Sequence, residues 1–172
     1  HTRYVAEVAT EVPEAAVPAV QKEVRHLLLR TMAFQLELMD IRPKLVLPAD
    51  AQEWQGKEYD SYQEEYIDLK SLQGEIITFV TEVERHELNE QESCSLNRAV
   101  HAARLALYSA KSLKDVKGNL DAFVDGSPFL DRFHGVLRKR LLASHIRIAK
   151  LLENGVLPDP TAEMVGILRQ LE

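Results

Sequence analysis

The sequence predicts an all-α protein, an elongated antiparallel bundle of four to five helices. Apolar residues recur three or four positions apart over long stretches, which is the period of an α-helix. The 172 residues include only 7 glycines and 7 prolines. Because these residues are typical of turns and loops, their small number favours a few long elements over many short strands. No stretch alternates between apolar and polar residues over the length that a strand needs.

Two apolar stripes predict the first two helices. The first stripe runs over 17–41 and the second over 62–83, each on one face of its helix. Prolines mark the joints, because proline cannot continue the hydrogen-bonding pattern of a helix. Those around the first stripe are Pro13, Pro18, Pro43 and Pro48. We expect the first pair to precede the first helix and the second pair to follow it.

The third helix is predicted to begin at a capping box. Asn89 is a preferred N-cap residue, and Glu92 stands three positions later, where its side chain can reach back. The stripe continues over 96–110 and then moves to another face of the helix over 113–123. A helix that changes its apolar side midway is expected to pack against two neighbours in turn.

A fourth helix is predicted after residues that suit the end of one helix and the N-cap of the next. Gly126 suits the end of one helix, and Ser127 with Pro128 suits the cap and first turn of the next. Its stripe covers 129–152, and a short fifth helix is predicted over 165–171 after similar signals at 154–155 and 159–160. Residues 1–172 are expected to form one domain.

Composition narrows the function classes. A formal net charge of −6 argues against a nucleic-acid partner, which would need a concentrated basic face. Cys94 is the one cysteine and cannot form an internal disulfide; we expect it to be a small packing residue. No stretch approaches the roughly 20 apolar residues that cross a bilayer. The first residue is His1 rather than Met, so the chain is expected to be a fragment of a longer protein.

Two Glu/His pairs in the sequence are candidate metal ligands. Carboxylate-bridged dimetal bundles need two Glu-x-x-His units and two further glutamates, whereas this chain has one unit, Glu23 to His26. Glu82 and His86 lie four apart. We expect both pairs to face solvent, as charged helix faces usually do.

A row of acidic residues and one histidine each have two possible interpretations. Asp68, Glu75 and Glu82 recur every seven residues, with Glu64 and Glu65 nearby. Such a row could bind a hard cation through its oxygens, although a solvated face is the ordinary interpretation. His145 occupies an apolar position of the fourth stripe, where we expect a half-buried ring with one hydrogen-bonded nitrogen; a ligand or pH-switch role is the alternative.

The third helix carries the most informative polar residues. Helical spacing places Arg104, Lys111 and Asp115 on one face, with Tyr108 between them and Asn119 one turn further. Lys111 and Asp115 are expected to form an intrahelical pair. No phosphate-binding loop, nucleophile elbow or paired zinc-ligand motif accompanies them, so the sequence predicts no enzyme and no cofactor.

The run from Ser109 to Val116, Ser-Ala-Lys-Ser-Leu-Lys-Asp-Val, is followed by Asn119 and Leu120. It resembles the PhoU-like domain that follows the membrane part of bacterial sodium/phosphate cotransporters. The segment from Pro18 to Glu23 is similar to the first helix of that family. The resemblance covers about residues 13–124.

The resemblance implies a non-catalytic regulatory or assembly domain for sodium-dependent phosphate symport, at the cytoplasmic face of the membrane. Its partners would be the transporter part of the same polypeptide and a second copy of the domain. In stand-alone PhoU proteins, acidic metal-binding motifs correspond to Lys111 and Asp115 here. Because a lysine ammonium offers no lone pair, we expect no metal at Asp115. The alternative is a free-standing metal-binding bundle that uses Glu23, His26 and the acidic row.

Overall fold

The computed structural model describes residues 2–49, 51, 59–124 and 126–153. Within these residues it has four α-helices and no strand, which confirms the predicted all-α class. The helices are α1 (Pro13–Leu38), α2 (Tyr62–Val83), α3 (Glu90–Val124) and α4 (Pro128–Leu152), and a short 3-10 turn, η1 (Pro43–Leu45), follows α1. The predicted fifth helix and the signals before it lie outside the described residues.

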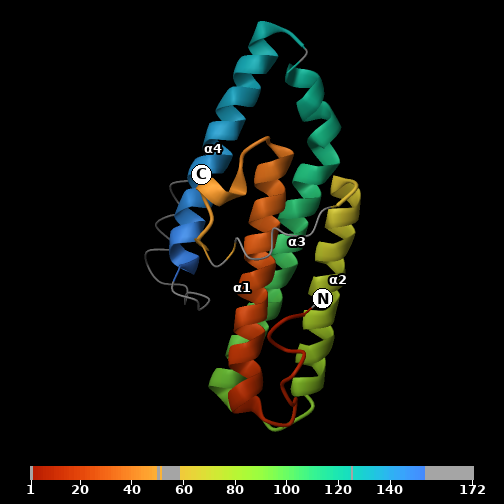
Figure 1. Ribbon diagram of the computed structural model, residues 1–172. Coiled ribbons are helices and arrows are strands. Elements are labelled where there is room, and N and C mark those ends of the chain that lie inside the picture. Colours follow the sequence, from red (N-terminus) through yellow and green to blue (C-terminus); the bar gives the residue numbers. More distant parts are fainter. Residues whose placement is uncertain (1, 50, 52–58, 125, 154–172) are drawn as a thin grey trace.

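Successive helices run in opposite directions along one long axis (Figure 1). α1, α2 and α3 lie side by side, and α3 continues well past the ends of the other two. α4 returns from that far end and reaches the C-terminal part of α1. The 35 residues of α3 correspond to about 52 Å at 1.5 Å per residue, which explains the elongated shape.

Two apolar clusters hold the helices together, and α1 contributes to both. The larger cluster joins α1, α2 and α3 around side chains such as Phe34, Leu72 and Leu96, all fully buried. Leu107 also belongs to it and is 6% exposed, as predicted. The smaller cluster packs Leu29, Met32 and Leu36 of α1 against Leu47, Ala149 and Leu152. α1 is therefore the central helix of the bundle.

The start of α1 differs from the prediction. The helix begins at Pro13, a favoured first position, and Pro18 lies inside it rather than before it. Pro18 has no N–H to donate to the carbonyl of Glu14, one turn back. The helix tolerates this loss because the surrounding side chains, including Val17 and Val20, are buried in the larger cluster.

The end of α1 also comes earlier than the apolar stripe indicates. The helix stops at Leu38, and Asp40 adopts a left-handed backbone with φ of 54°. The N–H of Ile41 donates to the carbonyl of Leu36 and that of Asp40 to Glu37, both at 2.9 Å. This is a Schellman arrangement, so Ile41 packs beyond the helix although it keeps the helical spacing.

Both predicted caps are confirmed. Asn89 and Glu92 exchange two hydrogen bonds between backbone N–H and side-chain oxygen, each 2.9 Å long, immediately before α3. Ser127 accepts a hydrogen bond from the N–H of Leu130, and Pro128 occupies the first turn of α4. The change of apolar face along α3 is confirmed at Leu120, which is buried, and at Phe123, whose ring centroid lies 6.0 Å from that of Phe133 of α4; Val116 of the same predicted stripe is 42% exposed.

Candidate functional site

Five side chains form a continuous exposed row on α3, which we call the α3 strip. They are Arg104, Tyr108, Lys111, Asp115 and Asn119, and the structure leaves every one of them exposed. The opposite side of the same turns carries the small residues Ala103, Ala106 and Ala110, which are buried. Small residues on one side allow close helix packing, and that packing leaves the polar row facing outward.

Two charged residues of the α3 strip are paired with each other. Lys111 and Asp115 form the predicted ion pair, and the ammonium of Lys114 lies 2.8 Å from the second oxygen of Asp115. The hydrogen bond from Lys111 lowers the pKa of Asp115, and the same bond raises the pKa of Lys111. Both groups are therefore charged at neutral pH. Two ammonium groups on one carboxylate disfavour a metal ion there.

Lys114 ties this pair to the neighbouring helix. Its ammonium lies 5.1 Å from the centroid of the Tyr66 ring on α2, a distance at which a cation and an aromatic face attract each other. The centre of the α3 strip is thus positioned by contacts within α3 and with α2.

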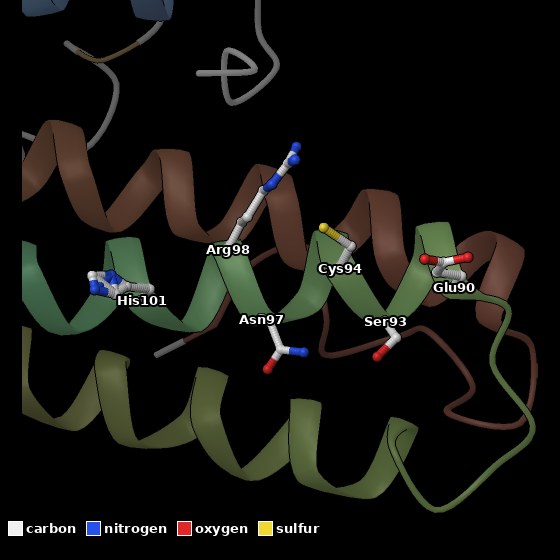
Figure 2. Close-up of a pocket in the computed structure, with 6 residues that line it drawn as sticks. All are labelled: Glu90, Ser93, Cys94, Asn97, Arg98 and His101. Atoms are coloured by element: carbon white, nitrogen blue, oxygen red, sulfur yellow. The ribbon is translucent and has the colours of Figure 1, made fainter. Parts of the chain in front are cut away.

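The same face of α3 continues toward its N-terminus as a shallow hollow of about 540 Å³ (Figure 2). Six residues line it: Glu90, Ser93, Cys94, Asn97, Arg98 and His101. In Figure 2, α3 lies between α1 and α2; Ser93 and Asn97 point toward α2, whereas Cys94 and Arg98 point the opposite way. The six side chains therefore do not converge on one point in this view.

Cys94 corrects a prediction. It is exposed in this hollow rather than packed as a small filler. Asn97 and His101 were missed as members of the polar face, although spacings of three and four residues connect them to Arg104. Extending that spacing toward the N-terminus would have found them.

The Glu23 and His26 pair corrects another prediction, because both side chains are buried rather than solvent-facing. One carboxylate oxygen of Glu23 accepts hydrogen bonds from the backbone N–H groups of Arg3, Tyr4 and Val5, and the other lies 2.9 Å from Nδ1 of His26. Burial raises the pKa of Glu23, but these hydrogen bonds outweigh it and lower the pKa. The unit anchors the N-terminal segment to α1.

The acidic row of α2 does not act as one group. Asp68 accepts hydrogen bonds from Arg30 and Tyr59, each 2.7 Å long. Glu75 accepts from the backbone N–H of Thr2, and Glu82 pairs with Arg85. Across the described ranges, no three or more His, Cys, Asp or Glu side chains are grouped so that they could hold a metal ion.

A second hollow, of about 490 Å³, lies where α1, α2 and α3 meet, and it contains two carboxylates. Glu37 and Glu65 line it together with aromatic and apolar side chains, among them Phe34 and Tyr59. Burial, with the nearby charges of Glu37 and Asp68, raises the pKa of Glu65 to about 7. The proximity of Glu37 and Glu65 could not be predicted from the sequence, because only helix packing brings them together.

His145 is buried and both of its ring nitrogens are engaged, which corrects the expectation of a half-buried ring with one bond. Nδ1 lies 2.9 Å from the carbonyl oxygen of Leu141, and Nε2 lies 3.0 Å from the side-chain amide of Gln35. Gln35 in turn bonds Ser109 of α3 at 3.0 Å. Burial lowers the pKa of His145, and the network connects α1, α3 and α4 through this ring.

No protein-family model, curated protein or solved structure matches the chain. In the part of the chain that the structure describes, no helix combines the length and apolar character of a membrane span. Fold and surface together define an all-helical bundle whose longest helix presents a charged, outward-facing strip.

Proposed function

We propose that this chain is a non-catalytic regulatory or assembly domain of a sodium-dependent phosphate cotransporter, positioned at the cytoplasmic face of the membrane. The observation that carries the proposal is the place of the Ser109–Leu120 sequence. The residues that resemble the cotransporter family lie on the one helix that spans the whole bundle, and Lys111, Asp115 and Asn119 face outward from it. Such a surface suits recognition by another protein surface.

The surroundings of the α3 strip suit a regulatory role. Regulation requires two arrangements whose balance a partner shifts by contacting them differently. Ser109, on the turn between Tyr108 and Lys111, is linked through Gln35 to His145. A partner that displaces α3 at the strip would therefore disturb the packing of α1 and α4 as well.

The alternative, a free-standing metal-binding bundle, has less support. Glu23 uses both of its oxygens inside the fold, and Asp68 is held by Arg30 and Tyr59. Neither carboxylate could bind a cation without giving up these hydrogen bonds.

The proposal is tested on the parent gene and on the protein that it encodes. The region upstream of His1 is expected to encode several apolar spans of about 20 residues each. Deletion of residues 13–172 should then change the rate of sodium-dependent phosphate uptake, or its response to phosphate, at normal membrane expression. Unchanged uptake in phosphate-rich and phosphate-poor conditions would rule out the regulatory role, and a start codon close upstream would favour the alternative.

A further inference from the structure

The charge of the chain is distributed unevenly, and α4 carries most of its positive charge. The helix has six basic residues and one acidic residue, Asp131, which gives it a net charge of +5. The whole chain carries −6, so the remainder is strongly acidic. The negative net charge of the whole chain therefore does not reflect the concentration of basic residues in α4.

Five of these basic side chains are exposed, and they lie on the outward side of α4. They are Arg132, Lys139, Arg140, Arg147 and Lys150. Among the residues that the structure describes, none of the five forms an ion pair with a carboxylate. The sixth, Arg138, points toward the bundle, where its guanidinium donates to the carbonyl oxygen of Asp40 at 2.7 Å.

Large apolar side chains are interleaved with these charges. Phe129, Phe133 and Val136 are 74%, 49% and 46% exposed, and their spacing of four and three residues places them on the same outward side. The inward side is different, since it carries the buried residues His145, Ala149 and Leu152. α4 thus has one face that belongs to the bundle and a second, basic and apolar face that is largely exposed, although Phe133 also contacts Phe123 of α3.

We propose that this second face of α4 binds the surface of an anionic lipid bilayer. A helix with Lys and Arg beside exposed Phe residues is suited to the bilayer interface, where rings enter the headgroup region and basic groups meet lipid phosphates. α4 begins at the tip where α3 and α4 meet (Figure 1), and Phe129 is its second residue.

Shape and chemistry favour lipid over other acidic partners. Neither hollow described above is lined by α4, and the face is the convex side of a helix rather than a groove that could enclose a peptide. Phenyl rings could also stack on nucleic-acid bases, but Val136 offers a base no such contact, whereas a deformable bilayer accommodates aliphatic, aromatic and basic side chains together. From Phe129 to Lys150 the face extends about 32 Å along the helix, long enough to contact many lipids at once.

The test measures co-sedimentation of the full 172-residue chain with vesicles. Phosphatidylcholine vesicles containing about 30 mol% phosphatidylglycerol should bind it, pure phosphatidylcholine vesicles should not, and added salt should weaken binding. Arg132→Gln with Lys139→Gln should weaken partitioning about 30-fold, since each basic group near an anionic surface contributes roughly fivefold. Phe129→Ala should weaken binding further without changing the fold, because that ring is largely exposed.

The matched control removes two exposed basic groups elsewhere. Lys70→Gln on α2 with Arg85→Gln just after α2 changes the net charge equally and should leave partitioning within about twofold. Equal loss in the control pair, or equal binding to neutral vesicles, would overturn the proposal. Absence of vesicle binding would also overturn the proposal. This holds if the face instead binds a second copy of the chain, in an association that Phe129→Ala disrupts, and also if it binds a single-stranded oligonucleotide. The vesicles contain no transporter, so this result is independent of the proposed role in phosphate transport.

Discussion

At the scale of single residues, buried polar groups explain more of this structure than exposed ones. Glu23 is fully buried and connects the N-terminal segment to α1 through three backbone N–H groups and His26. A charged acceptor strengthens such bonds, and removing it would leave buried donors without partners. The Glu-x-x-His unit is therefore a structural anchor.

The first prediction concerns this anchor. Glu23→Ala should lower the free energy of unfolding by about 3 kcal/mol, measured by urea denaturation at neutral pH. Because folding lowers the pKa of Glu23, its contribution is present above the ordinary value of 4.5 and is lost as pH falls through the lowered folded-state pKa. Glu82→Ala, which removes an exposed pair with Arg85, should cost less than about 0.5 kcal/mol. Equal effects of the two substitutions would contradict the anchor.

The second prediction concerns Glu65 and has the opposite sign. Its folded-state pKa of about 7 exceeds its ordinary value of 4.5, so folding takes up a proton between these pH values and stability falls as pH rises through them. Glu65→Gln should therefore stabilise the protein at pH 8 by about 1 kcal/mol, a figure reduced for partial solvent contact. The gain should disappear near pH 4.

This prediction is checked by measuring the free energy of unfolding as a function of pH for the parent protein and for Glu65→Gln. The exposed Glu87→Gln substitution provides the control, with an expected change within about 0.5 kcal/mol. A Glu65→Gln protein that is no more stable than the parent at pH 8 would show that burial and the neighbouring carboxylates do not raise the pKa of Glu65.

At the scale of elements, α3 determines the architecture because its two halves pack against different neighbours. Leu107 is buried in the larger cluster, while Leu105, two residues earlier, is 55% exposed. The third prediction is that Leu107→Ala costs about 2–5 kcal/mol of stability, the range for truncating a buried leucine. Leu105→Ala should cost less than about 1 kcal/mol in the same chemical denaturation. Similar losses at the two sites would mean that the helix faces are wrongly assigned.

Periodicity and caps predicted the helices well, because both depend on local sequence. The stripe over 62–83 and the Asn89 to Glu92 capping box appear in the structure as predicted. The errors arise where tertiary contacts override local rules. Pro18 is accepted within α1 because its neighbours are buried, and Ile41 lies beyond α1 because Asp40 reverses the backbone.

The site was predictable in part for the same reason. The outward row from Arg104 to Asn119 follows from helical spacing alone, and all five residues are exposed. The Gln35 and His145 contact joins residues 110 positions apart and could not be inferred from spacing. The basic residues of α4 can be read from the sequence. The net charge of −6 for the whole chain, however, does not show that they are concentrated in one helix.

At the scale of the whole molecule, α1 is shared between two apolar clusters, and three surfaces differ in character. The α3 strip carries paired charges, the α2 side is acidic, and α4 is basic and apolar on its outward face. Segregated charge of this kind orients a domain relative to its surroundings. The two proposals concern different surfaces: binding of a transporter is proposed for the α3 strip and contact with lipid for α4.

The central proposal, that the α3 strip regulates phosphate transport, is tested most directly by uptake measurements on the parent protein. Arg104→Glu with Lys111→Glu reverses two exposed charges of the strip; Lys44→Glu with Lys70→Glu reverses two exposed charges elsewhere. At equal membrane expression, the strip variant should change sodium-dependent uptake, or its response to phosphate, at least about fivefold, the lower end of typical coupling between sites. The control variant should behave like the parent. Uptake by the strip variant that matches the parent in both phosphate-rich and phosphate-poor conditions would contradict the claim.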